Sequence, residues 1–329
     1  MTETIYLIIG SLLLLLGIYD FFLTTLSASG AGFITRAVAF STHAVIRKLK
    51  GPTGRGIFNI SGLLVNLSVL AVWIFLVWLG LFLVFSFDPD GMTNDTGRVA
   101  NWIERLYYTG YTLSTLGVGN FKTTTAFFEI ITSIFSFFGF IFFTSSMTYL
   151  ISVSSAVINK RTLSRSIQNL GKDPQEIADK LNSLDSSYSI QQLQSFQEMV
   201  DRHAVNHQAY PVVHFFSHKR QDVCLGLNLV RLDEALNILF STPKDNLTIE
   251  LQPLRAAVTH FIYHVNQNYS RSLPKGQAGD AKKALSYEVT AINENELAKR
   301  REILGGLLQN EGFEWRDVME GRDPFETRT

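Results

Sequence analysis

The sequence has a single cysteine, no net charge and none of the common enzyme motifs. Cys224, the one cysteine, excludes a disulfide bond within the chain. Lysine plus arginine number 29, as do aspartate plus glutamate, so the net charge indicates no nucleic-acid partner. The sequence lacks a phosphate-binding loop, a nucleophile motif, a metalloprotease helix, a dinucleotide-binding fingerprint and a calcium-binding loop. It therefore predicts a protein that is not an enzyme and needs no cofactor.

Long apolar stretches are what the chain does have. They cover residues 5–26, 57–87 and 125–157, and each reaches the roughly 20 residues that a membrane-crossing helix needs. Glu3 stands where a signal peptide has its basic start, so we expect the first stretch to remain as an anchor. Asp20, near its end, should face protein or the membrane interface. These stretches predict an all-α membrane protein.

Basic residues predict how the chain crosses the membrane. They cluster between the first two stretches and after the third, at Arg36, Arg47, Lys48, Lys50, Arg55, Lys160, Arg161 and Arg165. Because such clusters favour the cytoplasmic side, we expect the N-terminus and the loop at 88–124 to lie outside the cell. The C-terminal half would then be cytoplasmic and the membrane would be the plasma membrane.

A glycine-containing motif lies between the second and third stretches. Residues 112–120 read Thr-Leu-Ser-Thr-Leu-Gly-Val-Gly-Asn. Alternate glycines allow a backbone in which successive carbonyl oxygens point to one side. Four such strands around an axis can replace the water shell of a cation. The motif therefore indicates a cation-conducting loop, and a tight extracellular turn is the simpler alternative.

Over residues 57–158 the chain resembles the tetrameric potassium channels. The corresponding filter residues are Thr115, Leu116, Gly117, Val118, Gly119 and Asn120. The resemblance implies an aromatic pair at Tyr107 and Tyr108, a hydroxyl-bearing last helix turn at Thr112, and a hinge at Gly139. It also implies two spans and one pore loop per chain, so that a pore requires a homotetramer. The extra N-terminal helix and basic segment, 1–56, lie outside the resemblance.

Two filter positions depart from the family pattern, and they leave the permeant ion open. Val118 replaces an aromatic residue, so Tyr107, Tyr108 or Tyr111 would have to fill the space behind the filter. Asn120 replaces an aspartate and loses its charge. We therefore expect a potassium-permeable channel, with a non-selective sodium and potassium channel as the alternative. A non-conducting scaffold with a vestigial loop is a further alternative, whereas potassium uptake transporters carry four loops in one chain.

Residues on one face of the inner helix are candidates for the gate. Helical spacing places Thr144, Thr148, Ile151 and Ser155 on that face. Ile151 could form an apolar constriction that closes by losing its water. A position against lipid or another helix is an equal alternative for Ile151.

Residues 159–329 predict an all-helical cytoplasmic domain with a flexible linker near 272–285. Apolar stripes at 190–200 and 254–265 indicate amphipathic helices. Six histidines are spaced i, i+4, as His203/His207, His214/His218 and His260/His264. Such pairs could hold a metal ion or sense protons near neutral pH, and hydrogen-bonded histidines within a helical bundle are the alternative. Membrane lipid and an unidentified cytoplasmic ligand or protein are the expected partners.

Overall fold

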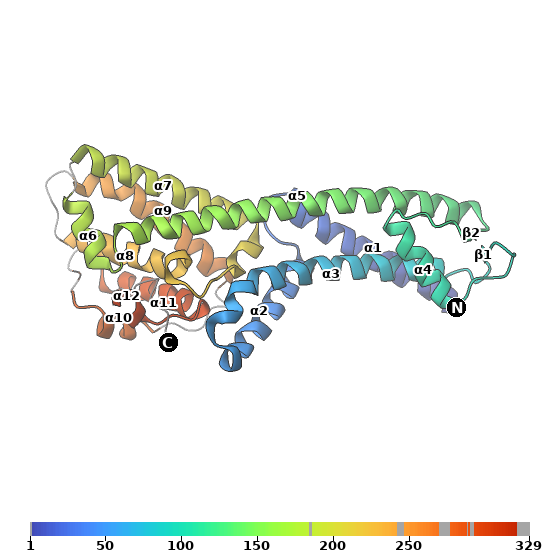
Figure 1. Ribbon diagram of the computed structural model, residues 1–329, viewed down its shortest axis with the longest axis horizontal. Coiled ribbons are helices and arrows are strands. Elements are labelled where there is room, and N and C mark those ends of the chain that lie inside the picture. The colour runs from blue at the N-terminus through green and yellow to red at the C-terminus, as the bar shows by residue number, and fades with distance from the viewer. Residues whose placement is uncertain are drawn as a thin grey trace. The chain divides into compact units, whose positions relative to one another are not determined.

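The computed structural model describes residues 2–183, 186–241, 247–269, 277–287, 289 and 293–320. Their regular secondary structure is helical except for one two-stranded antiparallel sheet (Figure 1). The α-helices are α1 (Thr2–Leu26), α2 (Phe33–Thr53), α3 (Phe58–Phe85), α4 (Trp102–Leu113), α5 (Ala126–Leu170), α6 (Pro174–Ser183), α7 (Ser186–Ala209), α8 (Leu225–Ser241), α9 (Leu247–Tyr269), α10 (Ala278–Ala284), α11 (Glu294–Asn310) and α12 (Trp315–Met319). The strands are β1 (Met92–Asn94) and β2 (Phe121–Thr123), and short 3₁₀ helices occur at Gly54–Ile57, Pro211–Phe215 and Gln221–Val223.

Three of the described helices are long and apolar enough to cross a membrane. They are α1, α3 and α5, over Glu3–Leu26, Phe58–Phe85 and Ala126–Leu170. Helix α1 contains the whole of the first predicted stretch, and α3 and α5 contain nearly all of the second and third. The prediction of an all-α protein with three apolar spans is therefore confirmed.

The chain forms two compact units, which we call the membrane unit and the C-terminal unit. The membrane unit comprises Met1–Thr42 and Leu64–Val153, and the C-terminal unit comprises His43–Leu63 and Ser154–Thr329. The division expected at 56/57 and 158/159 stays a prediction. The start of α3 packs within the C-terminal unit. There the Ser61 hydroxyl donates to the Phe215 carbonyl at 2.7 Å, and the Lys219 amide donates to Asn59 Oδ1 at 2.9 Å.

Glycine and a buried carboxylate hold the first helix of the membrane unit. A Cβ atom at Gly10 of α1 would lie 2.8 Å from the Gly80 carbonyl oxygen of α3, so the two backbones are in close contact. Asp20 is buried and accepts hydrogen bonds from the Trp73 indole at 2.9 Å and the Ile34 amide at 2.8 Å. The expectation that Asp20 faces protein is confirmed.

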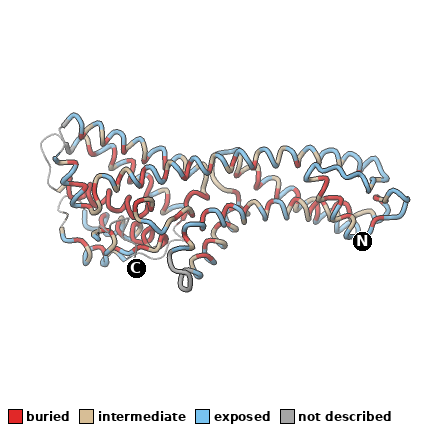
Figure 2. Tube along the Cα trace, in the orientation of Figure 1, coloured by how far each residue is buried: buried red, intermediate tan, exposed pale blue. Residues whose placement is uncertain are grey.

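The C-terminal unit is built around α8. Every residue from Leu225 to Leu239 is buried, although this stretch includes five polar or charged side chains. Four helices pack against α8, namely α6, α9, α11 and α12, and α7 packs against α9. Figure 2 shows the burial along each helix. The apolar stripes predicted on α7 and α9 are confirmed, since Leu193, Phe196, Val258 and Phe261 are buried.

The segment expected to be a linker is partly helical. Residues 272–276 lie outside the described residues. From Ala278 to Ala284 the chain forms α10, in which Ala281 is buried. Alanine and lysine favour helix formation, and the buried Ala281 anchors this short helix.

Candidate functional site

The predicted pore loop begins with α4, whose start is capped by side chains. The Asn101 side chain accepts from the Glu104 amide at 3.0 Å, and the Glu104 carboxylate accepts from the Asn101 amide at 2.8 Å. This reciprocal pair is a capping box, which satisfies backbone donors at the first helical turn. Arg98 adds a salt bridge to Glu104 at 2.5 Å. The helix start is therefore fixed by local sequence, as the Asn-x-x-Glu spacing allows.

The backbone after α4 alternates in the sign of φ. Thr115, Gly117 and Gly119 have φ values of 59°, 58° and 80°, whereas Leu116 and Val118 do not have positive φ. Glycine tolerates this conformation, but for a β-branched threonine it is an outlier that surrounding structure must hold in place. Outliers of this kind concentrate at functional sites. The alternation is the backbone pattern that a row of carbonyl groups facing one side requires.

Both ends of this strand are anchored within the membrane unit. At its start, the amides of Thr115 and Leu116 donate to the carbonyls of Thr112 at 3.1 Å and Tyr111 at 3.0 Å. At its end, Phe121 opens β2 and pairs with Asn94 of β1. Between the anchors, the amides of Gly117, Val118 and Gly119 form no hydrogen bond with the described part of the chain. The central strand thus has donors that need partners from water or another molecule.

The filter residues are exposed on the single chain. Leu116 is 69% exposed and Val118 is 46% exposed, although both are large apolar side chains. Thr115, Gly117, Gly119 and Asn120 are exposed as well. The single chain therefore presents residues 115–120 at its surface.

The three tyrosines before the filter divide into two roles. Tyr108 is buried and packs against Phe85 with tilted rings, 5.2 Å between their centroids. Its hydroxyl lies 2.7 Å from the Thr132 hydroxyl. Tyr111 is also buried and donates to the Phe121 carbonyl at 3.4 Å, just after the filter. Tyr107 is 44% exposed and packs edge-on against Tyr111. Tyr111, followed by the buried Thr112, is therefore the support closest to the filter, whereas Tyr108 joins α4 to α3 and α5.

Gly139 lies where α5 meets the end of α4. A Cβ atom at this position would come within 2.0 Å of the Leu113 carbonyl oxygen. Glycine thus allows the last residue of α4 to touch α5, and α5 runs unbroken through it from Ala126 to Leu170. The structure gives Gly139 a packing role, and its role as a hinge stays a prediction.

The candidate gate residues share an exposed face of α5. Thr144, Thr148, Ile151 and Ser155 are all exposed, and the exposed fraction of Ile151 is 64%. The Thr148 hydroxyl donates back to the Thr144 carbonyl at 3.0 Å, which satisfies it within the helix. This face is uncovered in the single chain, as both a pore-lining and a lipid-facing position require.

The histidines come together differently from the predicted pairs. His203 and His207 are both buried on α7, but His214 lies in the 3₁₀ helix Pro211–Phe215 and His218 lies beyond it. The 3₁₀ helix ends at Phe215, before His218, so the predicted placement of His214 and His218 on one helix face is wrong. On α9, His260 is exposed and His264 is half-buried.

A cluster forms across elements instead, centred on His207. Its Nε2 lies 3.1 Å from His214 Nδ1, and its ring centroid lies 5.8 Å from His203 and 5.4 Å from His264. Burial lowers the pKa of His203 to about 3 and the pKa of His207 and His214 well below 6.5. Among the described residues no group of three or more His, Cys, Asp or Glu side chains is arranged to hold a metal. These rings are therefore neutral at pH 7, which does not favour proton sensing near neutrality.

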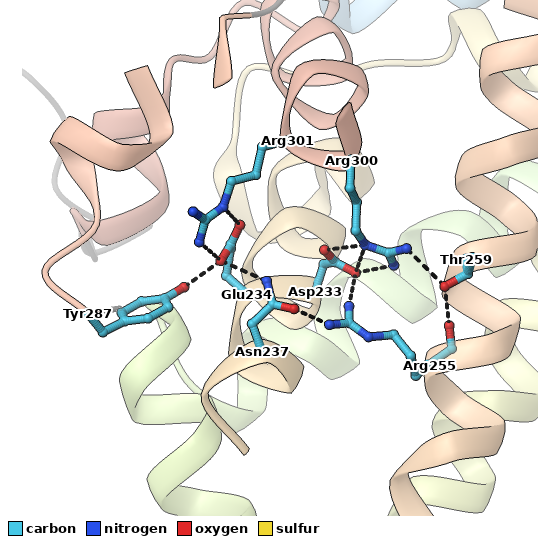
Figure 3. Close-up of polar contacts among 8 residues, drawn as sticks. All are labelled: Asp233, Glu234, Asn237, Arg255, Thr259, Tyr287, Arg300 and Arg301. Carbon is cyan, nitrogen blue, oxygen red and sulfur yellow. Dashed lines mark hydrogen bonds and ion pairs between the residues drawn. The ribbon is translucent and has the colours of Figure 1, made fainter. Parts of the chain in front are cut away.

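A buried ionic network on α8 has no counterpart in the sequence predictions. Asp233 lies between Arg255 and Arg300, and Glu234 binds Arg301 and the Tyr287 hydroxyl (Figure 3). The partners come from α9, the segment after α10, and α11. In the sequence, the adjacent Asp233 and Glu234 are the signal of this network. Charges on an otherwise apolar helix must be paired when the helix is buried.

No protein-family model and no solved structure matches this chain. The chain is similar to the uncharacterized membrane protein YdjJ of Bacillus subtilis (strain 168), with 30% identity over 324 residues. The match covers 94% of this chain and 95% of YdjJ, so it includes both units of the fold. The chain therefore belongs to the same family of membrane proteins as YdjJ.

Proposed function

We propose that the protein is a potassium-permeable cation channel of the cell membrane, formed by four copies of the chain. The observation that carries this proposal is the alternating backbone at Thr115, Gly117 and Gly119. This strand lies between the capped helix α4 and the strand β2, and α3 and α5 flank it in sequence. Four copies would surround a dehydrated cation with carbonyl oxygens. The N-terminus would lie outside and the C-terminal unit in the cytoplasm, following the basic clusters.

A non-selective cation channel is the second candidate, because of Val118. The exposed fraction of this side chain, 46%, indicates little packing behind it within the chain. A filter held less firmly at this position would discriminate less between potassium and sodium. Flux of each ion separates the two candidates.

The test is ion flux into liposomes that contain the purified protein, under a potassium gradient and then under a sodium gradient. Wild type is compared with Gly117→Ala, which strains the filter, and with Gly97→Ala as the matched control. Gly97 also has positive φ, at 81°, but lies in the turn after β1. We expect Gly117→Ala to abolish flux and Gly97→Ala to retain it.

A closed gate would hide conduction, so the same flux is measured for Ile151→Asn. This change hydrates the proposed constriction and should raise the basal flux several-fold. Absence of flux from wild type and from Ile151→Asn, for both ions, would overturn the channel proposal. Equal flux of both ions would support the non-selective channel.

A further inference from the structure

The C-terminal unit contains a pocket that the ion-conduction proposal does not use. Its volume is about 540 Å³, and it lies between α9 and α11. Its polar lining consists of Arg255, Thr259, Tyr263, Glu296, Lys299 and Arg300. A pocket of this size is within the range that holds small organic ligands and cofactors.

The buried charges beside the pocket do not balance. Asp233 is fully buried and is shared by two arginines, Arg255 at 2.8 Å and Arg300 at 2.5 Å. The neighbouring Glu234 is already paired, since Arg301 donates two hydrogen bonds to it at 2.7 Å each. Three arginines thus face two carboxylates, which leaves one positive charge in excess. Arg255 also lies over the Phe240 ring, 5.7 Å from its centroid, and this contact offsets only part of that excess. At the exposed rim the pocket has one further residue of each charge, Lys299 and Glu296.

Both arginines keep unused donors. A guanidinium group has five N–H donors in a planar fork. Arg300 uses Nε and Nη2 on Asp233 and Nη1 on Thr259, at 2.9 Å. Arg255 uses Nη1 on Asp233 and Nη2 on Asn237, and its Nε forms no hydrogen bond with the described residues. The arginine side chains are only 16% and 14% exposed, so the unused donors and the excess charge lie in a largely desolvated place.

Both arginines remain charged despite their burial. Burial lowers the pKa of Arg255, and the adjacent Asp233 opposes this effect. For Arg300, burial acts to lower the pKa, but Asp233 outweighs it and raises the pKa overall. Asp233 itself has a lowered pKa, because the two arginines outweigh the effect of its burial. A buried, uncompensated cation is costly, and an anion in the pocket would remove that cost.

We propose that this pocket binds a small anion that carries a phosphate or carboxylate group, held by Arg255 and Arg300 with Lys299 at the rim. Arginine forks match both groups in bidentate geometry. Thr259 holds Arg300 in place, and Tyr263 supplies an exposed ring beside the anion.

The test is a binding titration of the protein in detergent. Binding is measured by the shift in unfolding temperature and by calorimetry. Pyrophosphate and citrate are the probes, each at constant ionic strength, because salt screens non-specific attraction. We expect a saturable rise in unfolding temperature with at least one probe, and the probe that acts identifies phosphate or carboxylate as the ligand group. No saturable response to either probe at millimolar concentration would overturn the proposal.

Variants locate the binding. Arg255→Gln and Lys299→Gln should each weaken binding of the active probe about tenfold, since each removes a charged donor. Arg202→Gln, an exposed arginine on α7 outside the pocket, is the matched control and should bind as wild type. If Arg255→Gln does not fold, the affinity of the Lys299→Gln variant for the active probe decides whether the pocket is the binding site. Equal affinity of Lys299→Gln and Arg202→Gln would contradict the assignment, whatever the outcome of the flux measurements.

Discussion

At the scale of single residues, Gly139 and Thr115 show how the candidate filter is positioned. Gly139 lets the carbonyl end of α4 touch α5, and Thr115 accepts a backbone conformation that threonine rarely adopts. Close contact at Gly139 thus fixes the helix from which the filter strand starts. The position of the filter depends on the absence of one side chain.

Gly139→Ala should therefore disturb the filter more than the helix that carries it. The added methyl group would overlap the Leu113 carbonyl, and overpacking of this kind costs about 1–3 kcal/mol. We expect ion flux in liposomes to fall at least tenfold while the helical content is retained. Gly56→Ala is the control, since a Cβ atom there meets nothing within 4 Å. A Gly139→Ala protein with wild-type flux would remove this residue from the positioning of the filter.

At the scale of elements, the histidine cluster joins α7, the 3₁₀ helix Pro211–Phe215 and α9. Burial lowers the pKa of its central rings far below the value of about 6.5 for an unfolded chain. Below pH 6.5 the unfolded chain therefore binds protons that the folded unit does not. The packing of these elements is stable at neutral pH and weakens as the pH falls.

Unfolding of the purified protein should reveal this dependence between pH 7 and pH 5. Each histidine with a fully suppressed pKa lowers the free energy of unfolding by about 2 kcal/mol at pH 5 relative to pH 7. His203→Leu removes one such group, so its stability should depend less steeply on pH than that of wild type. His260→Leu, on an exposed position of α9, should keep the wild-type slope. A parallel pH dependence in all three proteins would contradict this account.

The helices could be predicted from the sequence where the pattern is local. The spacing of Leu193, Phe196 and Val200 identifies the buried face of α7, and Asp173-Pro174 identifies the start of α6. The histidine clustering could not be predicted, because His207 meets His214 across a chain turn at Pro211. The pairing of Asp233 with Arg300 spans 67 residues, and no periodicity within a helix encodes such a contact.

At the scale of the whole molecule, the exposed apolar surface of the membrane unit is consistent with assembly in the bilayer. Leu116, Phe137, Phe143 and Ile151 are each more than 60% exposed on the single chain. Lipid or neighbouring copies must cover such side chains. The proposed channel would surround each candidate filter strand with the corresponding strands of neighbouring copies.

We therefore expect four copies of the chain in mild detergent. Native mass measurement and chemical cross-linking of membranes should both give a tetramer, because one pore loop per chain closes a ring only by rotational symmetry. Gly117→Ala, which alters the strand but leaves the helices in place, should retain this stoichiometry. Cross-linked products that stop at the dimer would contradict a four-fold pore.

The charged core of α8 also has a consequence for the order in which the protein is made. Asp233 and Glu234 leave the ribosome 67 residues before Arg300 and Arg301, and Arg231 leaves 87 residues before its carbonyl partner Val318. Arg255, the other partner of Asp233, follows that residue by only 22 positions. At about 5–20 residues per second, Glu234 therefore waits on the order of three to thirteen seconds for Arg301. During that interval, burial of α8 would leave an unpaired charge in its core, so exposure of the helix to water has the lower free energy. Closure of the C-terminal unit is thus deferred until α11 and α12, which supply these partners, have been synthesised.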